Sequence, residues 1–275
     1  MIEIPEATVI ARELDKVIVG KTIKRFLYGF SEHKFTFFNE GMEENSRKVI
    51  GKKISNIVPR CFYVEILIEE YTLLFRDGTN IRYHKDEDTL PEKHQLLIEF
   101  DDGSFIAVSV SMYGCIELCM GKSDNKYYNL ELKGVSPLLD EFSEEYFLSL
   151  VNDNTKKLSA KAFIATEQRI PGIGNGVTQD ILFNACINPK TKIKNLTSEE
   201  ISNLYSSLKT TVLDMISKNG RDTEKDIYGV SGSYKTIMSK NNMNGPCPVC
   251  GDILKKENYL GGSIYYCFKC QKLKK

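Results

Sequence analysis

Four cysteines near the C-terminal end of the sequence have the spacing of a metal site. They form two Cys-x-x-Cys pairs, Cys247 with Cys250 and Cys267 with Cys270, and 16 residues separate the pairs. This spacing is typical of a zinc ribbon, in which each pair forms a tight turn and four thiolates surround one metal ion tetrahedrally. Because protein ligands fill all four positions, we expect one structural Zn²⁺ that stabilises a segment too small to fold alone. Two pairs at ribbon spacing favour metal binding over thiol redox chemistry.

The other four cysteines fall in apolar stretches, and we expect them to be small core residues. They are Cys61, Cys115, Cys119 and Cys186. The N-terminus MIEIPEATVI lacks the pattern of a secretory signal, and the sequence has no apolar run long enough to cross a membrane. We therefore expect a cytoplasmic protein without a disulfide framework.

Charge gives an ambiguous indication of the partner. The formal net charge is 0, whereas nucleic-acid-binding domains are usually basic. From Ser231 onward, however, eight lysines face only two acidic residues. A local basic face is compatible with this distribution.

The turn Pro171-Gly-Ile-Gly-Asn175 precedes an apolar pattern of helical period. Glycines allow close approach of a ligand, and a helix N-terminus offers unpaired N–H groups to an anion. The turn therefore suits a phosphate group, although a plain connection between two helices has the same composition. It is not a dinucleotide-binding fingerprint, because no strand precedes it.

Residues 1–120 are rich in short β patterns, such as 56–68 and 94–110, and Asp102-Gly103 is a hairpin signal. A helix is expected over 6–19, ending before Gly20. Together these patterns predict a β-sandwich with a helix at its edge.

From Ser136 the pattern becomes helical, with helices expected over 142–153, 157–168, 176–187 and 196–220. Thr197 and Glu200 have the spacing of a capping box. Residues 221–245 are expected to be a flexible connector. We predict an α+β multidomain protein with a β-sandwich at 1–120, a linker at 121–136, a helical domain at 137–230 and a zinc finger at 231–275.

This order of parts resembles the formamidopyrimidine-DNA glycosylase and endonuclease VIII family. The supporting stretches are the N-terminal MIEIPE, GKTI at 20–23, KHQLLIEFDDGSF at 93–105, the Tyr113-Gly114 pair, SPLLDEFSEEYF at 136–147, PGIGNGVTQDILFNACINP at 171–189, the Tyr228-Gly229 pair and the four ligand-spaced cysteines. The resemblance implies a β-sandwich, a helix–two-turn–helix domain and a zinc finger around damaged double-stranded DNA. It implies a DNA N-glycosylase of base excision repair, with AP lyase activity as a second step.

The resemblance also implies roles for single residues. Asn175 and the amides around Gly174 would hold a DNA phosphate, and Lys161 would contact the backbone; a solvated helix charge is the alternative for Lys161. Glu3 would shuttle protons during the reaction. Glu6 would share this role or, as we favour, stabilise the first turn of a helix.

The sequence departs from the family at several of these positions. Ile2 replaces the N-terminal proline whose amine is the family's nucleophile, so the free amine would belong to Met1, about 3.5 Å away. Phe62 falls where a basic strand residue is expected, which leaves Arg60 as the nearest candidate for DNA contact. The finger hairpin reads Gly261-Gly262 in place of an arginine.

Two further segments bear on the missing groups. The loop that fills the gap left by a flipped base offers only Met112 as a wedge. His33 and Lys34 form the one nearby pair that could compensate.

Two interpretations follow. The first is a glycosylase that acts on oxidised or ring-opened bases. The second is a relative that binds damaged DNA without cleaving it, because the nucleophile and the strand lysine are missing. A zinc-dependent protein-interaction module is a third class, but it leaves the glycine turn unexplained. In each DNA interpretation we expect a monomer that associates with the nucleoid and not with a membrane.

Overall fold

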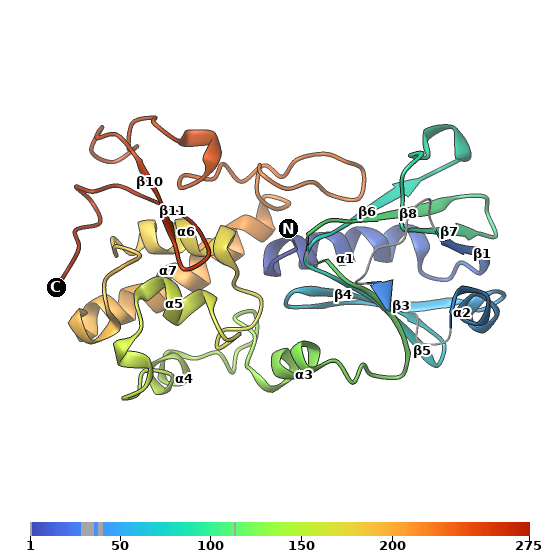
Figure 1. The fold of residues 1–275 in the computed structure, drawn as a ribbon, viewed down its shortest axis with the longest axis horizontal. Coiled ribbons are helices and arrows are strands. Elements are labelled where there is room, and N and C mark those ends of the chain that lie inside the picture. The colour runs from blue at the N-terminus through green and yellow to red at the C-terminus, as the bar shows by residue number, and fades with distance from the viewer. Residues whose placement is uncertain (1, 29–35, 38–40, 113) are drawn as a thin grey trace. The chain divides into compact units, whose positions relative to one another are not determined.

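The computed structural model describes residues 2–28, 36–37, 41–112 and 114–275 (Figure 1). The chain forms two compact units. One comprises Met1–Asn129 with Glu224–Gly232, and the other comprises Leu130–Thr223 with Ser233–Lys275. The chain therefore passes between the units three times. The four-part division drawn from the sequence stays a prediction.

The first unit is built mainly of short strands. Its elements are α1 (Ile4–Ile18), β1 (Ile23–Tyr28), β2 (Thr36–Phe37), α2 (Met42–Val49), β3 (Ile54–Arg60), β4 (Tyr63–Ile68), β5 (Tyr71–Arg76), β6 (Thr79–His84), the 3₁₀ turn Glu87–Thr89, β7 (Leu96–Phe100), β8 (Phe105–Val110) and β9 (Ile116–Met120). The helix α3 (Lys126–Lys133) begins in this unit and ends in the other.

The strands form two sheets, as a sandwich requires. One has the order β1-β7-β8-β6 and the other β2-β9-β5-β4-β3. The neighbours pair antiparallel, except for the parallel pair β2 and β9. The predicted hairpin at Asp102-Gly103 is confirmed: it joins β7 to β8, and Gly103 has a φ of 81°.

Apolar side chains of both sheets and of α1 meet in one core. Contributors include Ala7, Ile10 and Leu14 from α1, Ile66 and Phe75 from one sheet, and Phe26, Ile98 and Ile106 from the other. Burying such side chains contributes about 1.5–3 kcal/mol each for the larger ones. The apolar residues that recur at helical spacing in the sequence thus form the face of α1 that packs against the core.

α1 starts two residues earlier than the sequence suggested, because a capping box forms at its N-terminus. Glu3 is the N-cap, and its backbone N–H donates to Glu6 Oε2 at 3.3 Å. At the other end Gly20 adopts a φ of 86°, which favours glycine. The structure confirms the capping role favoured for Glu6.

Residues 221–245 are not a flexible connector, and that expectation is wrong. Ile227 is fully buried in the core of the first unit, and its carbonyl accepts a hydrogen bond from the Tyr83 N–H at 2.9 Å. Arg82 Nη1 donates to the Asp226 carbonyl at 2.9 Å. Long-range packing fixes this segment, and a polar local sequence gives no sign of it.

The second unit contains short helices and a β-hairpin. Its elements are α4 (Glu144–Ser149), the 3₁₀ turn Thr155–Lys157, α5 (Ala160–Ala165), α6 (Asn175–Asn184), the 3₁₀ turn Ile193–Asn195, α7 (Ser198–Ser217), the 3₁₀ turn Lys240–Asn242, β10 (Lys255–Tyr259) and β11 (Gly262–Tyr266). Thr197 and Glu200 form the predicted capping box of α7, and Gly220 follows its C-terminus with a φ of 88°. With the sandwich and the cysteine-bearing hairpin, this confirms the predicted fold class.

The β-rich residues 56–68 contribute to the hairpin of β3 and β4, in which Cys61 turns the chain with a φ of 54°. The segment 121–136 contains α3. Cys186 is exposed just after α6, so it is not a core residue, whereas Cys115 is buried as expected. Among the residues described, no helix is both long and apolar enough to span a membrane.

Candidate nucleic-acid interface and metal centre

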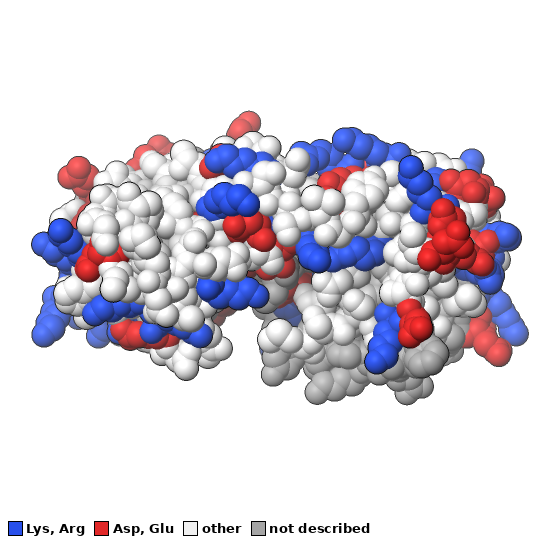
Figure 2. All heavy atoms as spheres, turned by 90° about the horizontal axis from the view of Figure 1, so that it is seen from above, with Lys and Arg blue, Asp and Glu red and all other residues white. Residues whose placement is uncertain are grey.

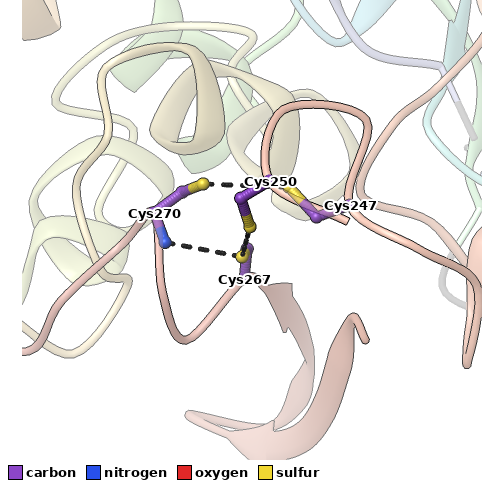
Figure 3. Close-up of side chains that lie close together, drawn as sticks. All are labelled: Cys247, Cys250, Cys267 and Cys270. Carbon is purple, nitrogen blue, oxygen red and sulfur yellow. Dashed lines mark hydrogen bonds between the residues drawn. The ribbon is translucent and has the colours of Figure 1, made fainter. Parts of the chain in front are cut away.

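The four cysteines of the second unit converge on one point (Figure 3). Cys247 and Cys250 come from the loop before β10, and Cys267 and Cys270 follow β11. The Gly251 N–H donates to the Cys247 carbonyl at 2.9 Å, and Gly251 has a φ of 73°. Glycine is favoured here because the knuckle reverses the chain in the left-handed region.

The sulfur positions fit a tetrahedral metal ion. All four Sγ atoms lie within 4.8 Å of one another, with 3.8 Å between Cys247 and Cys270 and 3.5 Å between Cys250 and Cys267. A tetrahedron with metal–sulfur bonds of about 2.3 Å has sulfur–sulfur edges of about 3.8 Å. The predicted ligand set is therefore assembled.

The hairpin that carries this centre reaches the N-terminus of α6. Its tip is the two-residue turn Leu260-Gly261, and both residues have positive φ, as this type of connection requires. Gly262 follows on β11. A Cβ placed on Gly262 would lie 3.5 Å from Lys161 Nζ and 3.6 Å from Asn175 Cγ. The β10–β11 hairpin, α5 and α6 thus meet at one spot (Figure 1).

Lys161 is buried rather than solvated, with 3% of its surface exposed. Its Nζ donates to the Tyr259 carbonyl at 2.7 Å, and burial lowers the pKa of Lys161. An ammonium group has three N–H donors, so this carbonyl uses one of them. The structure excludes the solvated alternative that the sequence left open.

Asn175 is the first residue of α6, and Gly174 is its N-cap. Asn175 Nδ2 donates to the Ser263 carbonyl at 3.2 Å. The backbone amides of the first helical turn and the positive end of the helix dipole lie at the same place. The arrangement joins a cation, a carboxamide and a helix N-terminus, which together suit a phosphate.

In the first unit, the N-terminal carboxylates lie at the start of α1. Glu3 is 1% exposed and Glu6 is also buried. Ile2 is 2% exposed and packs in the core of the unit. Met1, His33 and Lys34 lie outside the described residues, so their predicted roles stay predictions.

A small pocket opens beside these carboxylates. The space in it that a water-sized group can occupy is about 20 Å³, and its walls contain Ile2, Glu6, Ile10, Thr79, Asn80, Ile81, Arg82, Glu224 and Lys225. The isoleucines are almost fully buried, and the remaining side chains offer donors and acceptors. Burial lowers the pKa of Arg82. The enclosed space has room for about one water molecule, so a larger group would enter only if the walls moved apart.

Arg60 and Phe62 lie at the β3–β4 turn. Arg60 is half-exposed, and its Nε donates to Glu65 Oε1 at 3.2 Å. Phe62 packs against Tyr63, Leu74 and Tyr128. The turn thus offers one partly neutralised cation, and the role of Arg60 in DNA contact stays a prediction.

Met112 is 73% exposed in the loop between β8 and β9 and has a φ of 52°. A close contact of two glycines supports this loop: a Cβ on Gly78 would lie 2.5 Å from Gly114 N. Neither position therefore accepts a side chain without movement of the backbone. Met112 is an exposed apolar side chain, and its wedge role stays a prediction.

Charge alone does not mark the site. Figure 2 shows lysines and arginines interspersed with acidic residues and large neutral areas on one face. The specific contacts of Lys161 and Asn175 are more informative than this pattern.

Two groups of residues at these sites were not predicted from the sequence. Gln179 bridges α6 and β11, and it is buried one helical turn after Asn175. That four-residue spacing was a readable signal. Asn80, Arg82 and Lys225 line the pocket, but no local pattern connects a β6 residue with the 224–232 segment.

Comparison with known sequences gives full-length matches, although no family model matches the chain. The formamidopyrimidine-DNA glycosylase of Bacillus cereus is 24% identical over 277 residues, covering 98% of this chain and 99% of that protein. The enzyme of the same name from Carboxydothermus hydrogenoformans is 27% identical over 278 residues, covering 99% and 100%.

Solved structures share the fold. Lactococcus lactis Fpg (MutM), in complex with DNA containing N7-benzyl-Fapy-dG, matches with a TM-score of 0.84 at 23% identity, covering 98% of this chain and 99% of that one. Thermus thermophilus MutM (Fpg) matches with a TM-score of 0.81 at 19% identity over the same shares. The chain is thus similar from end to end to formamidopyrimidine-DNA glycosylases, and it shares the fold of the solved Fpg (MutM) structures.

Proposed function

We propose that the protein binds damaged duplex DNA and removes oxidised or ring-opened bases as a DNA glycosylase. One observation carries the DNA-binding part: Lys161, Asn175 and the N-terminus of α6 gather against the hairpin of the cysteine centre. The family names and the damaged DNA in the related Lactococcus lactis complexes support the choice of ligand. The expected site of action is the cytoplasm, on the nucleoid.

Phosphate is the part of DNA that this site suits. The ammonium of Lys161 supplies charge, the carboxamide of Asn175 supplies an N–H donor, and both are held by backbone carbonyls. Such contacts fix the position of a strand and carry no sequence information. This matches a protein that must examine many sequences for damage.

The cysteine centre would hold one structural Zn²⁺ through Cys247, Cys250, Cys267 and Cys270. The ion would keep the two knuckles together and thereby fix the hairpin. No ligand position remains for a substrate, so the ion's contribution is to stability.

The pocket beside α1 is the candidate site for an extruded base, which would have to widen it. Unstacking a base is least costly when it is damaged, which contributes to selectivity. Asn80, Arg82 and Lys225 would donate to carbonyl oxygens of an oxidised or ring-opened base, and Glu224 would accept from its N–H groups.

The chemical step cleaves the bond between C1′ and the base nitrogen. A nucleophile adds to C1′ while the bonding electrons leave with the base, which gains a proton. With water as nucleophile, the Glu3 carboxylate would take up the proton that water loses. With the Met1 amine as nucleophile, the C1′–O4′ bond would then break, O4′ would gain a proton, and C1′ would be left as a covalent Schiff base. Loss of a proton from C2′ and departure of the 3′ phosphate would cleave the strand.

A damaged-DNA-binding protein without catalysis is the second candidate, and the burial of Ile2 favours it. Ile2 packs in the core and cannot stand in for a reactive proline amine. The apolar packing of Phe62 leaves the nearby strand without the expected basic group. On this view the pocket would recognise a lesion and release it unchanged.

Incubating the protein in excess with duplexes containing 8-oxoguanine, ring-opened guanine or an abasic site decides between the candidates. Base release that Glu3→Gln abolishes and Glu6→Gln retains would establish the glycosylase. A covalent protein–DNA adduct trapped with borohydride would show in addition that a Schiff base forms with an amine nucleophile. Salt-dependent binding without base release would establish the binder, and absence of salt-dependent binding would reject both.

A further inference from the structure

The side chain of Gln179 links α6 to the β10–β11 hairpin by hydrogen bonds. It is 3% exposed, and it lies one turn after Asn175 on the same face of the helix. Its Nε2 donates to the Ser263 carbonyl at 3.1 Å, and its Oε1 accepts from the Tyr265 N–H at 3.0 Å. One carboxamide therefore pairs with two alternate residues of β11.

This pairing replaces a missing neighbouring strand. β11 has β10 on one side only, and the outward groups of Ser263 and Tyr265 face α6. Backbone groups at a sheet edge need partners when they are buried. Gln179 supplies both a donor and an acceptor, so it fixes the position of β11 along the helix as well as its distance from it.

Gln179 also fixes the orientation of Asn175. Its Nε2 donates to Asn175 at both the backbone carbonyl, 3.0 Å away, and Oδ1, 3.2 Å away. Asn175 Nδ2 in turn donates to the Ser263 carbonyl at 3.2 Å. The oxygen of the Asn175 carboxamide is therefore turned toward Gln179. A primary amide has two N–H groups, and the one not directed at Ser263 remains for a ligand.

We propose that Gln179 is a positioning residue for phosphate binding. It sets the rotamer of Asn175, the residue through which it acts on the ligand. It contacts no DNA itself. This inference rests on the proposed DNA-binding function. It adds that Gln179 holds the Asn175 side chain in its binding conformation before DNA binds.

The substitution Gln179→Met keeps the length and removes both polar groups. We expect it to weaken binding to a duplex with a stable abasic-site analogue at least about fivefold, and to weaken binding to undamaged duplex by the same factor. Fluorescence anisotropy measures both affinities. Asn184→Ala is the matched control, because it removes a 2.9 Å hydrogen bond to Thr211 from the same helix outside the site; its affinity should equal that of the wild type.

A double-mutant cycle with Asn175→Ala separates positioning from general stability. If Gln179 acts through Asn175, the double variant binds no more than about twofold weaker than Asn175→Ala alone. Additive losses, or wild-type affinity in Gln179→Met, would overturn the inference.

Gln179→Glu is a second variant in case the first is poorly folded. It keeps the acceptor for the Tyr265 N–H but sets an oxygen against Ser263 O and Asn175 Oδ1. We expect it to bind DNA at least as weakly as Gln179→Met while it retains its metal; wild-type affinity would contradict the role. Failure of the wild type to bind DNA in a salt-dependent manner would reject the proposed function instead.

Discussion

Replacing Lys161 with methionine tests the phosphate site directly. Lys161 Nζ is anchored 2.7 Å from the Tyr259 carbonyl and points to the place where a Cβ on Gly262 would lie. Methionine keeps an unbranched stem of similar length and removes the charge. The hairpin lacks a basic residue at Gly261 and Gly262, so no neighbouring cation at the tip replaces the loss.

The magnitude follows from a single charge-assisted contact. A hydrogen bond to a charged group contributes about 1.5–3 kcal/mol, which corresponds to a loss of affinity of roughly tenfold to a hundredfold at low salt. One phosphate contact fewer reduces the slope of log K against log salt by about 0.9. Because burial lowers the pKa of Lys161, the wild type should lose this contact at a lower pH than exposed lysines would.

Anisotropy titrations with an abasic-analogue duplex, between about 50 and 200 mM salt, measure both the affinity and the slope. Lys209→Met is the control, because Lys209 Nζ also donates to a backbone carbonyl, that of Pro137 at 2.9 Å, but lies on α7. Wild-type affinity and slope in Lys161→Met would refute the reasoning. An equal loss in the control would refute it as well.

Three further results are expected. Elemental analysis should find one zinc per chain in the wild type. Chelation of the metal, or Cys267→Ala, should lower the melting temperature and the DNA affinity together. Full DNA affinity without metal would contradict the structural role of the ion. Burial raises the pKa of Glu65 despite hydrogen bonds from Tyr128 and Arg60. The folded state therefore keeps this carboxyl protonated to a higher pH than the unfolded state does. The stability of the wild type falls as the pH rises from the pKa of Glu65 in the unfolded state through its pKa in the folded state. Glu65→Gln has no carboxyl to titrate, so thermal melts from pH 4 upward should show its stability rising relative to that of the wild type. A stability difference between the two proteins that stays constant with pH would contradict a raised pKa of Glu65. Asp180→Ala leaves the Ile237 and Met238 N–H groups without their acceptor. It should lower the free energy of unfolding, measured in urea, by about 2–6 kcal/mol. The control Asp214→Ala breaks an exposed ion pair with Lys218 and should lower it by at most about 1 kcal/mol.

Features that depend on local spacing were predictable from the sequence. The ligand cysteines stand three residues apart, and the capping box of α7 needs only Thr197 and Glu200. The helical stripe of α1 and the Asp102-Gly103 turn are equally local. In each case neighbours in sequence determine the geometry.

Features that depend on distant contacts were not predictable. Cys61 turns the β3–β4 hairpin without a glycine or proline in the turn. The burial of Lys161 depends on a carbonyl 98 residues away. Ile227 stands among polar residues, so its place in the core has no periodic signal.

The return of residues 224–232 to the first unit has a consequence for cutting the protein into pieces. A fragment that stops at Asn129 has every strand of the sandwich but lacks the buried Ile227, and Tyr83 then loses its backbone acceptor. The missing stretch is joined at both ends to the other unit, so no single cut separates the two units with both intact. Truncation therefore leaves an unfilled hole in the sandwich, whereas a circularly permuted or bipartite gene that supplies this stretch would close it.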